Sequence, residues 1–125
     1  MRNMVVAGGQ LGPISRDETK ASAVNRMITL MHQAASRGAQ LIVFPELALT
    51  TFFPRWWVEN ITDFDHMFER EMPNEDVLPL FETSKKLNIA FHLGYAELTP
   101  DGHRYNTAIM VNNIGKIIGL SLIHI

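Results

Sequence analysis

A short apolar run that ends in proline and is followed at once by a carboxylate constrains this chain most. Leu41 to Phe44 carry no polar side chain, and Pro45 and Glu46 come directly after them. Such a run is typical of a parallel strand that is covered on both faces, because neither face has to meet water. Open α/β sheets bind ligands just beyond the carboxyl ends of such strands. The pattern therefore predicts a buried strand with Glu46 at a functional position.

Two helices are predicted from the spacing of apolar residues. The first begins after Ser15 to Glu18, which has the form of a capping box, and ends at Arg37 and Gly38. Its buried face is expected to consist of Ala21, Val24, Met27, Ile28, Met31, Ala34 and Ala35. The second is capped by Asn74, has Glu75 and Asp76 in its first turn, and buries Val77, Leu80, Phe81, Ser84 and Leu87.

Five extended segments alternate with these helices. They are expected at Met4 to Gly8, Leu41 to Phe44, Ile89 to Tyr95, Tyr105 to Val111, and from Lys116 to Gly119. A right-handed crossover lays the first helix on the sheet between two parallel strands, and Asp101-Gly102 predicts a hairpin turn. The chain is therefore predicted to be an α/β protein. Two helices are too few to cover both faces of such a sheet.

Composition excludes several classes of partner. The chain has 125 residues, of which 46% are hydrophobic, and a net charge of -2 without a basic run or an acidic tail. We therefore expect no nucleic acid or membrane partner, and no segment is apolar enough to cross a bilayer. The absence of cysteine excludes disulfides, thiolate metal sites and a thiol nucleophile within these residues. A cytoplasmic location is the expectation.

Motifs for cofactors and metals are absent as well. The glycine-rich segment 8–13 fits neither common phosphate-binding pattern, and acidic residues follow it where a phosphate would bind. The five histidines show no metal-ligand spacing. The sequence therefore predicts neither an organic cofactor nor a metal ion.

Two segments offer candidate site residues, each with a second interpretation. Glu46 is either a general base, set among Phe44, Phe52 and Phe53, or a surface carboxylate that caps a turn. Arg55 and Trp56 either line a substrate entrance, with the arginine attracting a carboxylate, or serve in packing or a subunit contact. The local pattern leaves both pairs of alternatives open.

Longer stretches of the sequence resemble one enzyme family. The segment Ile42-Val43-Phe44-Pro45-Glu46-Leu47 is similar to the first catalytic motif of the nitrilase, or carbon–nitrogen hydrolase, superfamily. Within it, the chain closely resembles the bacterial N-carbamoyl-D-amino acid amidohydrolases. The segments that carry this likeness are Ala34 to Gly38, Phe44 to Trp56, Pro79 to Thr83, Leu93 to Leu98, Tyr105 to Thr107, and Gly115 to Gly119.

The resemblance implies an α-β-β-α sandwich that assembles into homo-oligomers, and a Glu-Lys-Cys triad that needs no cofactor. Glu46 matches the family's glutamate. The lysine falls just past the strand that begins at Lys116, so Lys116 itself is not that residue, and the cysteine lies further on. The activity implied is hydrolysis of N-carbamoyl-D-amino acids to the D-amino acid, ammonia and carbon dioxide.

The chain is interpreted as the N-terminal part of such an enzyme, over residues 1–119. We expect residues 120–125 to be a non-native tail, because they match one reading frame of a transposon-end adapter used in sequencing libraries. Without lysine and cysteine, this chain is predicted to be inactive. The alternatives are another amidase of the superfamily or a β-ureidopropionase, a non-enzymatic protein of the same fold, and a flavodoxin-like binding module.

Overall fold

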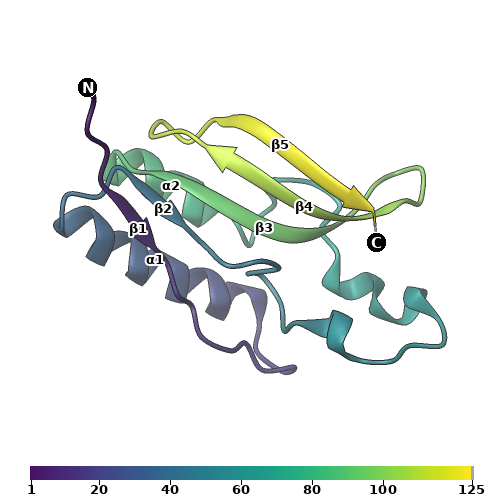
Figure 1. Cartoon of the computed structure of the whole chain (residues 1–125). Coiled ribbons are helices and arrows are strands. Elements are labelled where there is room, and N and C mark those ends of the chain that lie inside the picture. Colours follow the sequence, from purple (N-terminus) through teal and green to yellow (C-terminus); the bar gives the residue numbers. More distant parts are fainter. Residues whose placement is uncertain (125) are drawn as a thin grey trace.

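The structure of the chain is a computed structural model that describes residues 1–124. Within these residues, five strands form one mixed sheet in the order β1-β2-β3-β4-β5 (Figure 1). Their bounds are β1 Val6–Gly8, β2 Leu41–Val43, β3 Ala90–Leu98, β4 Arg104–Val111 and β5 Ile117–His124. The first three strands pair in parallel and the last three in antiparallel fashion. The predicted α/β class is confirmed.

Two helices, α1 (Lys20–Ser36) and α2 (Leu78–Leu87), pack side by side on one face of this sheet (Figure 1). The main core lies between the helices and the sheet. At its centre the fully buried Phe91 meets the ring of Phe81 at 5.2 Å and that of Phe44 at 6.5 Å, both edge to face. Burial of these rings, together with the aliphatic side chains of the core, drives this packing.

The start of α1 differs from the prediction. Its N-cap is Thr19, whose hydroxyl accepts from the backbone N–H of Ser22, and no acidic residue lies in the first turn. The Glu18 carboxylate accepts hydrogen bonds from Arg26, which lower its pKa, and from Ser22. It therefore does not serve a capping box with Ser15. Ala23 rather than Ala21 is buried, whereas the predicted end is confirmed, since Arg37 caps the helix and Gly38 has a φ of 79°.

The start of α2 is also later than predicted. Asn74 accepts from the backbone N–H of Val77, but this bond closes a turn that precedes the helix, and Glu75 lies in that turn. The first turn of α2 contains Pro79, whose fixed φ suits that position. The predicted buried face is confirmed at Leu80, Phe81 and Ser84.

Ser84 connects α2 to two loops, and its loss is expected to destabilise the fold. Its buried hydroxyl lies 2.7 Å from the carbonyl oxygen of Ile89 and 3.1 Å from that of Asn112. Ser84→Ala leaves both acceptors without this donor and should lower the free energy of unfolding by about 1–3 kcal/mol. Urea unfolding followed by circular dichroism measures this. The exposed Ser36→Ala is the matched control, and equal effects of the two variants would contradict the prediction.

The segment between β2 and α2 contains two short 3-10 helices, η1 (Phe53–Arg55) and η2 (Ile61–Met67). With the end of β3 they form a second hydrophobic group, here called the aromatic cluster: Leu47, Phe53, Phe64, Met67, Phe68, Ala96 and Leu98. Ala96 and Leu98 alternate along β3 with Leu93 and Tyr95 of the main core. The aromatic cluster therefore lies on the face of the sheet opposite the helices.

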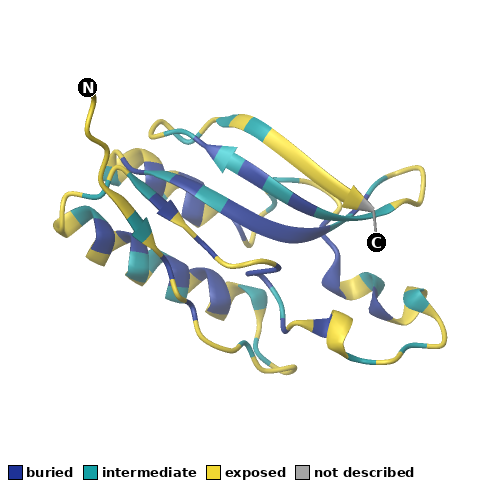
Figure 2. Ribbon diagram, viewed as in Figure 1, coloured by how far each residue is buried: buried dark blue, intermediate teal, exposed yellow. Residues whose placement is uncertain are grey.

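The rest of this second face carries no helix in the described part of the chain, and it is called here the open face (Figures 1 and 2). It presents apolar side chains to solvent, with Val6 53% and Val43 38% exposed. Strand β5, which is mostly exposed, extends through residues 120–124 of the predicted tail, while Ile125 lies outside the described residues. The hydrogen bonds that pair β5 with β4 are made by the backbone and require no particular side chains. The strand can therefore form whether or not residues 120–124 are native.

Candidate active site

Glu46 lies in the loop that follows β2, where the sequence places it. Its side chain is exposed, which corrects the prediction that three phenylalanines surround it. Phe44 is buried in the main core and Phe53 in the aromatic cluster, while Phe52 is 46% exposed. Phe44 and Phe53 therefore contribute their rings to these two hydrophobic groups and not to a shell around the carboxylate. The residues described here therefore leave Glu46 open on one side.

Asn106 of β4 is the partner of the Glu46 carboxylate. Its side-chain amide nitrogen donates a hydrogen bond to Oε1 of Glu46, across 60 positions of sequence. An ionised carboxylate only accepts hydrogen bonds, so the asparagine must present its NH₂ group. Asn106 was not predicted as a site residue, because nothing in the local sequence links it to Glu46. The contact fixes one carboxylate oxygen in place.

The loop that carries Glu46 is tied to β3 on both sides of the carboxylate. The N–H of Phe44 donates to the carbonyl of His92 at 3.0 Å, and the N–H of Ala48 donates to that of Gly94 at 2.9 Å. Between these bonds Leu47 has a φ of 48°, a left-handed conformation that residues other than glycine rarely adopt. The loop is therefore held in a specific shape by its neighbours and not by its own preference.

Arg55 and Trp56, the two other candidate site residues, differ in burial. Trp56 is half-buried against the aromatic cluster, with its ring 6.2 Å from that of Phe64. Two guanidinium groups, those of Arg16 and Arg55, lie 5.1 and 5.0 Å from the Trp56 ring. Trp56 therefore packs against the aromatic cluster, and its place at a substrate entrance stays a prediction. Arg55 remains exposed at the surface of the same segment.

A buried ion pair without a signal in the local sequence joins the start of α1 to the segment before α2. Lys20 Nζ lies 2.8 Å from Oε1 and 2.9 Å from Oε2 of Glu69, whose side chain is only 3% exposed. Asn74 donates a further hydrogen bond of 2.6 Å to Oε2. Nearby, burial and the charges of Glu97 and Glu69 raise the pKa of Tyr95, which stays a neutral phenol. The backbone N–H of Glu69 donates to the carbonyl of Ala96 and its carbonyl accepts from the N–H of Leu98, so the pair is connected to β3.

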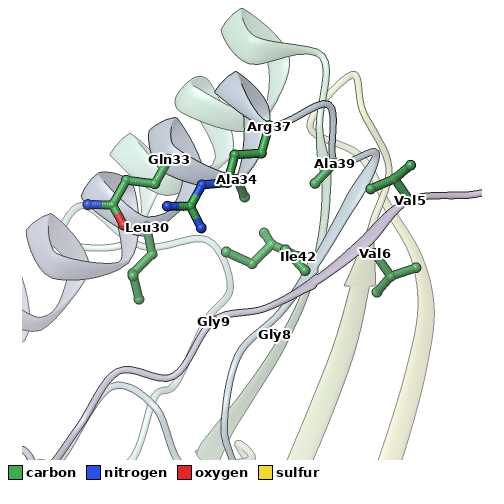
Figure 3. A pocket seen from close by; sticks show the side chains of 11 residues that line it. Val5, Val6, Gly8, Gly9, Leu30, Gln33, Ala34, Arg37, Ala39 and Ile42 are labelled. Atoms are coloured by element: carbon green, nitrogen blue, oxygen red, sulfur yellow. The ribbon is translucent and has the colours of Figure 1, made fainter.

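A pocket between β1 and the second half of α1 lies apart from Glu46 and Asn106 (Figure 3). Leu30, Gln33 and Arg37 line it from the helix, and Ile42 lines it from the sheet. None of its lining residues has a carboxylate or a nucleophile, so it offers no acid–base chemistry. Within residues 1–124, no three His, Cys, Asp or Glu side chains come together in a way that could hold a metal ion.

None of the helices formed by the described residues combines the length and the apolar character needed to span a bilayer.

Solved structures define the class of fold. The carbon-nitrogen hydrolase from Helicobacter pylori G27 matches with a TM-score of 0.72 and 21% identity, over 94% of this chain and 39% of that one. An amidase from Nesterenkonia sp. matches with a TM-score of 0.73 and 19% identity, over 95% and 42% of the two chains. The fold is therefore of the nitrilase type, and the described residues supply one sheet and one helical layer of the predicted sandwich.

Sequence comparison gives the family. Residues 5–122 match the model of the carbon-nitrogen hydrolase family, and the chain belongs to that family. A nitrilase from Meyerozyma guilliermondii is 31% identical over 100 residues, which cover 76% of this chain and 31% of the nitrilase. The chain thus spans about a third of the length of this relative.

Proposed function

We propose that the full-length protein hydrolyses N-carbamoyl-D-amino acids and that Glu46 is its general base. One observation carries the catalytic part of this proposal: in a chain of the carbon-nitrogen hydrolase family, Glu46 follows a parallel strand and has one oxygen fixed by Asn106. The Glu46 side chain is exposed, so its other oxygen is accessible to a proton donor. The substrate class is supported by the long segments that resemble N-carbamoyl-D-amino acid amidohydrolases, above all residues 44–56.

The mechanism implied by the resemblance is acyl transfer through a thioester-type intermediate. A cysteine thiolate attacks the carbamoyl carbon after Glu46 accepts the thiol proton, and Glu46 later activates water for release of the acyl group. A lysine ammonium and backbone N–H groups stabilise the oxyanion. Ammonia and carbon dioxide leave, and the D-amino acid remains. A cytoplasmic location and assembly into homo-oligomers belong to the same proposal.

The 125-residue chain itself is proposed to be inactive. It contains no cysteine, and the family position of the lysine falls within or beyond residues 120–125. Loss of such groups lowers rates by many orders of magnitude. The purified chain should release no amino acid from an N-carbamoyl-D-amino acid. Turnover above that of its Glu46→Ala variant would contradict this proposal.

The protein expressed from the intact gene tests the substrate class. It is assayed on N-carbamoyl-D-amino acids, their L-enantiomers, N-carbamoyl-β-alanine and a simple aliphatic amide, with amino acid or ammonia release as the readout. We expect the D-enantiomers to give the highest kcat/KM. A preference for N-carbamoyl-β-alanine or for the aliphatic amide would favour the alternative hydrolases. Absence of turnover on all four would favour a non-enzymatic member of the family.

A further inference from the structure

We propose that the β3–β4 hairpin positions Glu46, with Gly94 as the surface on which its loop rests and Asn106 as the anchor of its carboxylate. The inference rests on the role proposed above for Glu46 as general base. It assigns two positioning residues that act through Glu46 and do not themselves react. Three independent features of the structure carry it: a close approach of two backbones, a pair of backbone hydrogen bonds, and a side-chain contact.

Gly94 allows the loop to lie directly on the strand. A Cβ atom at Gly94 would lie 3.3 Å from Glu46 Cα, from Leu47 N and from Pro45 O. These three atoms belong to backbone, so no flexible side chain can move aside to make room. A methyl group would therefore push the loop, and Glu46 with it, away from the sheet by a few tenths of an ångström.

The same loop has little freedom to absorb such a shift. Hydrogen bonds from Phe44 to His92 and from Ala48 to Gly94 fix its two ends on β3. Between them, the positive φ of Leu47 places the chain in a region that only surrounding contacts can maintain. A shift of the loop caused by a side chain at position 94 would therefore move Glu46, because the rest of the loop cannot adjust to absorb it.

Asn106 completes the arrangement from the neighbouring strand. In the antiparallel pairing, Asn106 lies opposite Ala96 and Ala108 lies opposite Gly94, so Asn106 and Gly94 occupy the same face of the sheet. The loop bearing Glu46 passes over this face. The amide of Asn106 holds Oε1, so the carboxylate keeps one orientation while Oε2 is left to serve as the proton acceptor.

The hairpin's role in positioning predicts a loss of kcat without a matching loss of substrate binding. In the protein expressed from the intact gene, Gly94→Ala and Asn106→Leu should each lower kcat by about 10- to 100-fold, with KM changed less than about threefold. The controls are Gly8→Ala, where an added Cβ meets nothing within 4 Å, and Asn25→Leu on the exposed side of α1. Both controls should retain the parent kcat, and all variants should keep the parent circular dichroism spectrum.

A double variant separates positioning of Glu46 from an independent contact with substrate. If Asn106 acts through Glu46, adding Asn106→Leu to Glu46→Gln should change the residual kcat by less than about twofold. The proposal would be overturned if Asn106→Leu lowered kcat by the same factor in Glu46→Gln as in the parent. Full activity of both Gly94→Ala and Asn106→Leu would overturn it as well. Should Gly94→Ala fail to fold, the Asn106 variants still decide.

The readouts also distinguish this inference from the proposed function. Full activity of Glu46→Gln alone would defeat the role of Glu46 as base. An inactive Glu46→Gln together with a fully active Asn106→Leu would leave that role intact and defeat only the anchoring by Asn106. The choice of amide substrate does not affect this comparison, because each variant is measured against its own parent.

Discussion

Glu46→Gln is expected to lower kcat/KM of the full-length enzyme by about 100- to 10,000-fold, the range for loss of a general base. The substitution is nearly isosteric, and the glutamine oxygen can still accept the hydrogen bond from Asn106. The loop should therefore keep its shape while the proton acceptor is lost. Steady-state kinetics on the preferred N-carbamoyl substrate measure the effect.

The matched control is Glu75→Gln, which removes an exposed carboxylate in the turn before α2. It should leave kcat/KM within about twofold of the parent value, as surface changes away from the site usually do. Activity of Glu46→Gln equal to that of Glu75→Gln would show that Glu46 is only a surface carboxylate that caps a turn. That was the second interpretation of this residue from the sequence.

Lys20→Met is expected to cause the largest loss of stability among simple substitutions outside the apolar core. It removes the cation from Glu69, whose side chain is 3% exposed, and leaves a buried carboxylate with Asn74 as its remaining side-chain donor. Breaking a buried pair in this way typically costs about 3–5 kcal/mol, and the 23% exposure of Lys20 places the value toward the lower end. Urea unfolding at neutral pH measures the free energy.

Two further variants test the cause of this loss. Lys86→Met removes an exposed lysine from the last turn of α2 and should change stability by no more than about 0.5 kcal/mol. The double variant Lys20→Met with Glu69→Leu removes both charges and should regain most of the loss, because no buried charge remains. A Lys20→Met protein as stable as the parent would contradict the assignment of a structural ion pair.

The elements of the fold could be predicted from the sequence because they depend on local periodicity. The apolar spacing of α1, the end of that helix at Gly38, and the apolar run of β2 are each contained in one short segment. The turn at Gly102, where φ is 84°, has the same local character. These features would be recognisable in any tertiary setting.

The helix starts could not be predicted correctly from capping motifs alone. Glu18 is drawn toward the distant Arg26, whereas Asn74 keeps its bond to the N–H of Val77 but closes a turn that precedes α2. A capping motif read from four consecutive residues contains no information about such partners. Thr19, which does cap α1, has no special feature in the sequence apart from its residue type.

The position of Glu46 after β2 could be predicted from the sequence, but its neighbours in space could not. Asn106 and Gly94 reach Glu46 through the register of β3 and β4, which depends on how the hairpin closes beyond Leu98. A signal was nonetheless present in the sequence. If the hairpin turns at Asp101-Gly102, the alternation of side chains along the strand before the turn and the strand after it places Gly94 and Asn106 on the same face. What the sequence did not provide was the path of the loop across that face.

The topology of the sheet also sets an order in which its parts can assemble. Strands β3, β4 and β5 follow one another through short turns, so their pairing closes small loops, whereas β2 must find β3 across the whole of residues 44–89. Small loops close at lower entropic cost and therefore sooner. We expect the hairpin that carries Gly94 and Asn106 to form before β2 pairs with β3. Glu46, which follows β2, would then reach its place only after the surface that positions it has formed.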